Sequence, residues 1–275
     1  MWHTKLNTPV PTSDLIPRPH LSKKLENKSA VPLILISAPT GYGKSVLVSQ
    51  WIKENKRANA WISLDESMND SATFLNYLGE SLNRCSSHER EVLKKLDKEY
   101  NFLSWEAIIE IIINTLNKLE EQTRLILDDY HLITNQEIHQ LVQVLISDEI
   151  RNLQIIIITR WDPPFKLREL RLYHNICELR MSELRFKEDE LNQFVALHHN
   201  ASLIKDEIKM VIKRTEGWIL AIRMILLAKS FPNAGNKKKD FDFLTRDLDM
   251  LMSYISDSLD PNFFRQMQLC ALCDQ

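Results

Sequence analysis

The apolar segment 33–36 runs into a glycine turn that ends on Lys44 and Ser45, and this junction constrains the fold more than any other stretch of the chain. Only five glycines occur in 275 residues, and two of them, Gly41 and Gly43, lie in this turn. Glycine lets successive backbone N–H groups turn inward around an anion, and a helix that begins near Ser45 points its partial positive end at the same place. The pattern predicts a phosphate-binding loop, with Lys44 on the β and γ phosphates and the Ser45 hydroxyl on Mg²⁺.

The loop differs from the usual pattern at one position, because Ala38 stands where the first glycine is expected and Pro39 follows it. An ordinary strand-to-helix turn with a surface lysine is therefore the alternative for this motif taken alone. A second motif downstream favours the phosphate-binding interpretation.

That second motif is the pair Asp128 and Asp129, which follows the apolar segment 125–127. Adjacent carboxylates at a strand end raise each other's pKa unless a cation lies nearby, so the pair indicates a magnesium ion or a role in proton transfer. We expect Asp128 to hold the metal through water and Asp129 to polarise the attacking water. Taken alone, the pair is better explained as a solvated turn at a strand end; together with the glycine loop it predicts an ATP–Mg²⁺ site.

The β-branched segment 153–159 has almost no polar alternation, which is typical of a strand buried on both faces of a parallel sheet. It ends on Arg160, and ligands bind beyond the carboxyl ends of such strands. Arg160 is thus a candidate for contacting the γ-phosphate, with an exposed arginine at a strand end as the alternative. Shorter apolar segments at 60–64 and 176–179 complete an α/β fold with a parallel P-loop sheet.

The chain divides into four parts by composition and periodicity. Residues 1–185 form the predicted P-loop nucleotide-binding domain, in which 1–30 contain four of the ten prolines and are expected to be an extended lead-in. In this lead-in, Arg18 lies between two prolines, where the backbone could face a ligand; a solvated arginine is the alternative. Residues 186–232 show helical spacing, 233–240 read as a polar linker, and 241–275 are again helical and stop without a tail, which suggests a fragment.

Composition excludes several classes of protein. The formal net charge of −2 provides no overall basic field for nucleic acid, and no apolar run approaches the roughly 20 residues of a membrane span. No secretory signal pattern is present, so the cytoplasm is the expected compartment. The four cysteines are too scattered for a disulfide framework, and the Cys270–Cys273 pair has no second pair to complete a zinc site.

Seven short motifs together resemble the N-terminal part of the MalT-like large ATP-binding regulators of the LuxR type, which are signal-transduction ATPases with numerous domains (STAND). The similarity extends over nearly the whole chain, and Ala38 is normal in that family. The motifs are Arg18-Pro19-His20-Leu21, Ser37 to Ser45, Trp61-Ile62-Ser63-Leu64-Asp65, Asp128-Asp129-Tyr130-His131, Thr159-Arg160-Trp161-Asp162-Pro163-Pro164, Leu184-Arg185-Phe186 and Thr215-Glu216-Gly217-Trp218.

The resemblance implies a five-stranded parallel sheet, with the strand before Arg160 between those before the glycine loop and Asp128, then a helical arm and the start of a winged-helix domain. It implies that Asp129 supports ATP hydrolysis, that Arg160 senses the γ-phosphate, and that His131 and Arg171 are accessory residues. The implied nucleotide contacts are Arg18, Pro19, Pro39, Thr40, Gly41, Tyr42, Gly43, Lys44, Ser45 and Val46.

The resemblance also implies a regulatory switch, with an ADP-bound resting form and a self-associating form that holds ATP and an inducer. The inducer-binding domain and the DNA-binding helix-turn-helix of the family are absent from this sequence. A metabolic P-loop kinase, an oligomeric motor ATPase and a protein-binding scaffold with an inactive site remain alternatives at this point.

Overall fold

A computed structural model describes residues 2–10, 15–55, 57–85, 103–147, 150, 152–197 and 203–229. The chain divides into two compact units, Met1–Leu184 and Arg185–Gln275. Each unit is described by itself.

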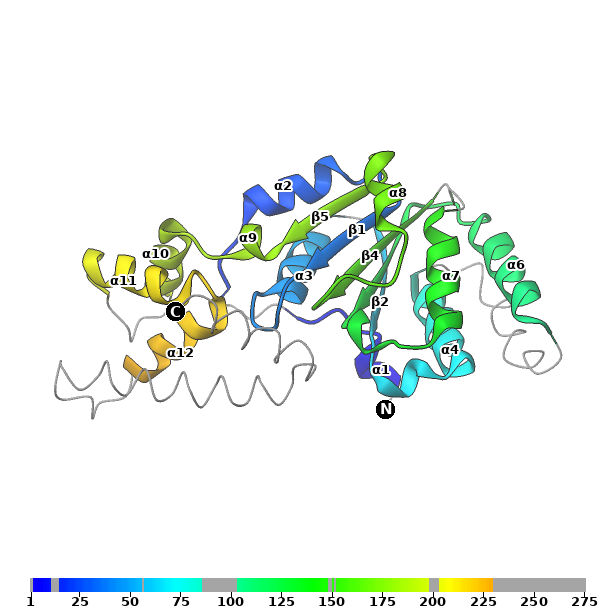
Figure 1. Cartoon of the computed structure of the whole chain (residues 1–275), viewed down its shortest axis with the longest axis horizontal. Helices are drawn as coiled ribbons and strands as arrows, with labels where there is room; N and C mark the ends of the chain where they lie inside the picture. Colours follow the sequence, from blue (N-terminus) through cyan, green and yellow to red (C-terminus); the bar gives the residue numbers. More distant parts are fainter. Residues whose placement is uncertain are drawn as a thin grey trace, which may run out of the picture. The chain divides into compact units, whose positions relative to one another are not determined.

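The first unit is built on a five-stranded parallel sheet with the strand order β2-β3-β4-β1-β5 (Figure 1). Its strands are β1 (Leu33–Ser37), β2 (Ala58–Ser63), β3 (Thr123–Asp128), β4 (Leu153–Thr159) and β5 (Ile176–Arg180). The predicted α/β class and parallel P-loop sheet are confirmed. So is the position of the strand before Arg160, because β4 lies between β1 and β3.

Helices cover both faces of this sheet, as the uninterrupted burial of β1, β3 and β4 requires. Alternate residues such as Leu125 and Leu127 join one apolar core with the helices α4 (Ser71–Cys85), α6 (Trp105–Leu116) and α7 (Gln136–Ser147). The side chains that alternate with these, such as Arg124 and Asp128, point to the other face of the sheet and contact α3 (Lys44–Glu54). Strand alternation thus assigns Asp128 to the face where α3 begins.

The carboxyl ends of the strands meet at one edge because the strands are parallel and in register. Ser37 pairs with Thr159, and Ser63 pairs with Asp128. Short helical segments follow these ends: η1 (Glu66–Asn69) after β2, η3 (Tyr130–Leu132) after β3, α8 (Leu167–Leu172) after β4 and α9 (Met181–Leu184) after β5.

The N-terminal segment contains two helices, so the prediction of an extended lead-in is wrong for part of it. Helix α1 covers Trp2–Lys5 and α2 covers Pro19–Asn27. Pro19 is tolerated in the first helical turn, where no intrahelical N–H donor is needed, and Leu21 and Leu25 bury one face four residues apart. Of the region before α2, residues 11–14 lie outside the described part of the chain.

The second unit begins as helices α10 (Glu188–Leu197), α11 (Lys205–Thr215) and α12 (Ile219–Lys229). Phe186 packs edge-on against Phe194, with ring centroids 5.7 Å apart. The predicted linker 233–240, the predicted winged-helix segment 241–275 and the Cys270–Cys273 pair all lie outside the described residues.

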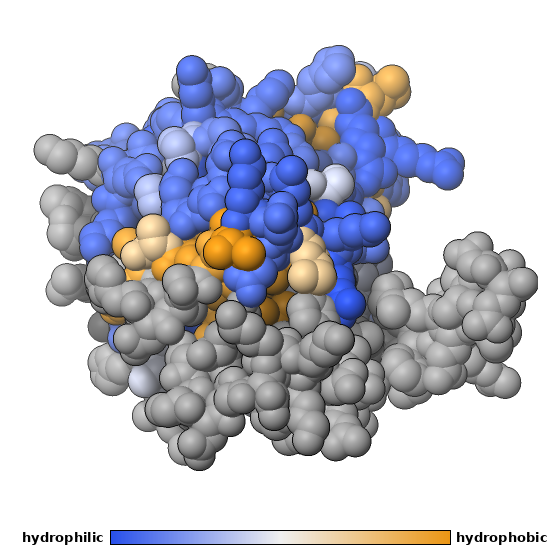
Figure 2. Space-filling view, turned by 90° about the vertical axis from the view of Figure 1, so that its left-hand side faces the viewer, coloured by the Kyte–Doolittle hydropathy of each residue, from blue (hydrophilic) through white to orange (hydrophobic). Residues whose placement is uncertain are grey.

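The exterior is mainly polar on the face shown in Figure 2, with a smaller group of apolar side chains among the hydrophilic ones. Within the described part of the chain, no helix combines the length and apolar character needed to cross a bilayer.

Candidate functional site

The turn between β1 and α3 adopts the backbone conformation that only glycine accepts readily. Gly41 has φ 80° and Gly43 has φ 72°, and Gly43 directly precedes the first residue of α3. A residue with a Cβ atom at either of these left-handed positions would destabilise the folded state by roughly 1–2 kcal/mol. Pro39, Thr40 and Tyr42 lie in this turn, and Val46 is in the first turn of α3. The two glycines therefore allow the turn that leads into the N-terminus of α3.

Lys44 is folded back across the turn. Its buried Nζ donates hydrogen bonds to the carbonyl oxygens of Ala38 at 2.7 Å and Pro39 at 2.9 Å. Burial lowers the pKa of Lys44 to about 8; Arg160 also lowers it, whereas Asp129 and Asp128 oppose the shift. Because the ammonium is held by neutral carbonyls in a desolvated place, an anionic phosphate would be a stronger partner.

Ser45 and Asp128 meet across the junction of α3 and β3. The Ser45 Oγ donates to Asp128 Oδ1 at 2.9 Å, and the backbone N–H of Asp129 donates to the same oxygen at 3.0 Å. Burial raises the pKa of Asp128 to about 6, with the neighbouring Asp129 adding to the shift. A hydroxyl and a carboxylate are the hard oxygen ligands that Mg²⁺ prefers, so these two residues fit such an ion.

Among the described residues, no group of three or more His, Cys, Asp or Glu side chains could hold a metal ion by itself. An ion at Ser45 and Asp128 would therefore need further oxygens from water or from a bound phosphate. Mg²⁺ is commonly held in this way, by one or two protein oxygens together with substrate phosphates.

Asp129 has a left-handed backbone, with φ 57° and ψ 38°, and its side chain is 51% exposed. Strand β3 ends at Asp128, so strand alternation does not extend to Asp129, which lies in the turn that follows. The following residue anchors the turn, because the buried hydroxyl of Tyr130 is 2.9 Å from His139 Nδ1 on α7. Asp129 thus projects from a well-anchored turn, as a group that orients water must.

His131 and Arg160 lie close enough to Lys44 for their charges to interact: Arg160 lowers the pKa of Lys44, and Lys44 lowers the pKa of His131. The buried His131 ring packs edge-on against Trp161, with centroids 5.1 Å apart, and its Nδ1 is 3.9 Å from Asp129 Oδ1. Burial, together with the charges of Arg160 and Lys44, lowers the pKa of His131 to about 4. His131 is therefore neutral at neutral pH.

The structure places the other predicted residues of the N-terminal segment differently. The buried Arg18 side chain donates to the carbonyl oxygen of Leu184 at 2.9 Å and of Glu183 at 3.4 Å, at the end of α9. Pro19 is the first residue of α2. These contacts give Arg18 a structural role, and its contact with a nucleotide stays a prediction, as does that of Pro19.

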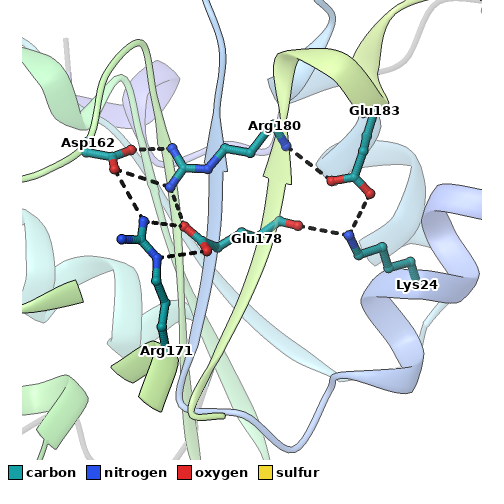
Figure 3. Close-up of polar contacts among 6 residues, drawn as sticks. All are labelled: Lys24, Asp162, Arg171, Glu178, Arg180 and Glu183. Carbon is teal, nitrogen blue, oxygen red and sulfur yellow. Dashed lines mark hydrogen bonds and ion pairs between the residues drawn. The ribbon is translucent and has the colours of Figure 1, made fainter. Parts of the chain in front are cut away.

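Arg171 belongs to a polar cluster on the edge strand β5 (Figure 3). Its guanidinium donates to both carboxylate oxygens of Glu178, at 3.0 and 2.9 Å, and contacts Asp162 at 3.5 Å. Arg180 forms ion pairs with the same two acids, Asp162 and Glu178. Lys24 donates hydrogen bonds to the Glu178 carbonyl at 3.0 Å and to the Glu183 carboxylate at 2.6 Å. The accessory role of Arg171 therefore stays a prediction, and no sequence pattern indicated this cluster.

A further residue that the sequence did not single out is Asn69, at the end of η1. Its Oδ1 accepts from the backbone N–H of Thr134 at 2.6 Å and of Asn135 at 3.1 Å, and its Nδ2 donates to Leu132 O at 2.9 Å. Asn69 thereby ties the loop after β2 to the segment that follows Asp129. The sequence showed only an acidic turn there, because the partners are more than 60 residues away.

Comparison with known proteins gives consistent results. No model of a known protein family matches the sequence. The curated protein "HTH-type transcriptional regulator MalT" of Yersinia pestis is 28% identical over 256 residues, which is 93% of this chain. The match covers 28% of the relative's length, so the chain spans little more than a quarter of the regulators it resembles.

Solved structures are similar in fold. A signal transduction ATPase with numerous domains and a tetratricopeptide repeat sensor, from Pyrococcus horikoshii, matches with a TM-score of 0.63 and 16% identity, over 92% of this chain and 34% of that one. A Walker-type ATPase of Pyrococcus abyssi matches with a TM-score of 0.53 and 15% identity, over 89% of this chain and 75% of that one. In sequence this chain is similar to the curated MalT regulators, and in fold it is similar to these two ATPases.

Proposed function

We propose that this chain is the ATP-binding and ATP-hydrolysing switch module of a larger transcription regulator. The contact between Ser45 Oγ and Asp128 Oδ1 carries the proposal, because it brings a hydroxyl and a carboxylate together at the N-terminus of a helix preceded by a glycine turn. Phosphate, Mg²⁺ and water are the ligands that this combination suits. The similarity to curated transcription regulators supports the regulatory context.

In this proposal, the backbone N–H groups of the Gly41–Ser45 turn and the positive end of α3 bind the phosphates of ATP or ADP. Lys44 exchanges its two carbonyl partners for phosphate oxygens, and Arg160 contacts the γ-phosphate. Ser45 and Asp128 hold Mg²⁺, Asp128 through water, and the ion neutralises charge on the phosphates when bound.

Hydrolysis needs a group that orients water beside the γ-phosphate, and we assign this role to Asp129. It follows the metal ligand Asp128 directly, in a left-handed turn, and its side chain is accessible. The neutral His131 borders Asp129 and adds no positive charge that would compete for it. Arg18 and Arg171 are secondary candidates, because both have other partners in the structure.

A nucleotide can switch the regulator only if it binds one conformation of the regulator more tightly than the other. To move the regulator from almost fully resting to almost fully active, the binding free energies of the nucleotide to the two conformations must differ by roughly 5.5 kcal/mol. We propose an ADP-bound resting form and a self-associating form with ATP and an inducer. The inducer-binding and DNA-binding parts would belong to the remaining length of the relatives, which are named HTH-type transcriptional regulators, and we propose that this chain acts in the cytoplasm.

Calorimetric titration with ATP and with ADP, with and without Mg²⁺, tests the proposal, together with an assay of ADP release. We expect Mg²⁺-dependent binding, slow hydrolysis without a second substrate, and loss of binding in Lys44→Ala. Equal ATP affinity in wild type and Lys44→Ala would refute the assignment.

The same measurements separate the alternatives. A metabolic kinase would release ADP only with a phosphate acceptor, and a motor ATPase would form rings with ATP. A protein-binding scaffold would gain no thermal stability from nucleotide, whereas saturation at 100 times Kd stabilises a true binder by roughly 2.7 kcal/mol.

A further inference from the structure

A large aromatic side chain that the proposed mechanism does not use lies exposed beside the candidate site. Trp161 directly follows Arg160 at the end of β4, and it is 42% exposed. Tryptophan is highly buried on average, so a ring that is exposed at this place requires a local explanation. The Trp161 ring lies edge-on against the ring of His131, with the centroids 5.1 Å apart. This contact points to a role for Trp161 at the turn that contains His131.

His131 is the residue that the Trp161 ring covers. Its side chain is only 3% exposed, whereas that of Asp129, two residues earlier, is 51% exposed. The buried Nδ1 of His131 has no hydrogen-bond partner among the described residues and lies 3.9 Å from Asp129 Oδ1. This distance is too long for a direct hydrogen bond. The Nδ1 atom therefore forms no bond that would fix the ring beside Asp129, which increases the importance of the packing against Trp161.

The segment that carries Trp161 is itself held at the end of the sheet. Thr159 Oγ1 donates a hydrogen bond to the Trp161 carbonyl oxygen at 2.8 Å, which fixes the backbone where β4 ends. Further along the same segment, the Phe165 ring packs against Tyr130, with the centroids 5.6 Å apart. Two aromatic contacts thus join the segment after β4 to the turn that contains Asp129, one through Trp161 and one through Phe165.

Removing the Trp161 ring would change the charge of His131. In the structure, burial together with the charges of Arg160 and Lys44 lowers the pKa of His131 to about 4. If water reached the ring, this pKa would rise toward the ordinary histidine value of about 6.5, and more of the protein would carry a protonated His131. A protonated ring would attract the Asp129 carboxylate 3.9 Å away and compete with the water that Asp129 orients.

We propose that Trp161 is a positioning residue for ATP hydrolysis that acts through His131: its ring keeps the imidazole buried beside Asp129, so that the carboxylate stays available to orient water. This inference rests on the proposed function, because it assigns a role in the hydrolysis step. Trp161 needs no contact with the nucleotide for this role. It should therefore affect the rate of hydrolysis and leave the affinity for ATP unchanged.

Single-turnover hydrolysis and calorimetric ATP binding of Trp161 variants test the role. We expect Trp161→Ala to bind ATP like wild type but to hydrolyse it about tenfold more slowly, because the group beside Asp129 is misplaced. Trp161→Phe keeps an aromatic ring against His131 and should restore most of the rate. The control Tyr173→Ala removes an aromatic side chain that is 70% exposed at the end of α8, and its rate should equal that of wild type. Melting curves verify that each variant is folded.

Proton NMR titration of the imidazole of His131 gives a readout that does not depend on activity, with the signal identified from its loss in His131→Gln. The pKa of His131 should rise by about 1 in Trp161→Ala and stay close to the wild-type value in Trp161→Phe. Either a wild-type rate of hydrolysis or an unchanged pKa of His131 in Trp161→Ala would overturn the proposal, as would a loss of ATP affinity that accounts for the slower rate. If wild type hydrolyses no ATP, the proposed function fails, and the titration still decides whether Trp161 shields His131.

Discussion

The hydroxyl of Ser45 donates a hydrogen bond to Asp128 Oδ1 over 2.9 Å, although 83 residues separate them in the chain. Each residue lies at an element boundary, Ser45 in the first turn of α3 and Asp128 at the end of β3. The two boundaries meet because β4 alone separates β3 from β1 and because Asp128 faces the side of the sheet covered by α3.

Replacing Lys44 with alanine should lower ATP affinity at least 100-fold. The ammonium would form charge-assisted hydrogen bonds to the phosphates, and each such bond contributes about 1.5–3 kcal/mol. Calorimetric titration measures the change. Lys53→Ala is the matched control, because Lys53 is an exposed lysine in the last turn of the same helix; a similar loss in that variant would contradict a specific role of Lys44.

The variant Asp129→Asn should keep ATP bound but lower the rate of hydrolysis about 100-fold, since an amide cannot accept a proton from water. Asparagine tolerates the left-handed backbone of this position, so the fold should be retained. Single-turnover assays of ADP formation measure the rate. Asp162→Asn removes a carboxylate of the β5 cluster and should hydrolyse ATP at the wild-type rate, whereas full activity in Asp129→Asn would exclude Asp129 as the water-orienting group.

Ser45→Ala should raise the Mg²⁺ concentration needed for half-maximal ATP hydrolysis about tenfold, equivalent to roughly 1.4 kcal/mol, because one oxygen ligand is lost. The measurement is a Mg²⁺ titration at saturating ATP. Ser49→Ala serves as control, because Ser49 lies one turn further along α3 and its hydroxyl donates to the Val46 carbonyl at 2.9 Å. If both variants require the same Mg²⁺ concentration as wild type, Ser45 is not a metal ligand.

Glu178→Gln should lower the free energy of unfolding at neutral pH and make it less sensitive to acid than in wild type. Hydrogen bonds from Arg171 and Arg180 lower the pKa of Glu178 from 4.5 to about 2. The carboxylate therefore stabilises the folded state fully above pH 4.5, and this contribution falls as the pH decreases from 4.5 to 2. Solvent screens the cluster, so we expect a loss of only about 1 kcal/mol at pH 7.

Urea unfolding of wild type and Glu178→Gln at several pH values measures the difference, which should shrink with acid and with added salt. A difference that stays constant from pH 7 to pH 3 would mean that the ion pairs do not stabilise the first unit.

Gly217→Ala should destabilise the second unit by at least about 2 kcal/mol. Gly217 has φ 74°, and a Cβ atom there would lie 2.5 Å from the Phe186 carbonyl oxygen and 2.8 Å from its nitrogen. The substitution adds left-handed strain and disrupts the 2.9 Å bond from Phe186 N to Gly217 O. Thermal unfolding measures the change.

The neighbouring Glu216→Gly gives the contrast, because Glu216 also has a left-handed backbone, with φ 49°. Glycine relieves that strain, so this variant should be destabilised far less despite losing the Arg185–Glu216 ion pair. Equal destabilisation of both variants would point to side-chain contacts and not to backbone geometry.

Local patterns in the sequence were sufficient to predict the five strands, the glycine turn and the helices after residue 186. A buried parallel strand needs an apolar run, and a left-handed turn needs glycine, so both leave a mark in consecutive residues. The extended lead-in was wrong where α2 forms, since its proline content concealed a short amphipathic helix that buries only Leu21 and Leu25.

The sequence by itself indicated candidates for binding phosphate and metal: Lys44 and Ser45 at the start of a helix after a glycine turn, and Asp128 and Asp129 where a strand ends. Only the tertiary structure decided which of them meet, because strand order and the position of α3 set the distance between Ser45 and Asp128. The same is true of Arg18 on the α9 carbonyls and Arg171 in the β5 cluster. A hydrogen bond between distant residues depends on packing, and packing leaves no local pattern at either end.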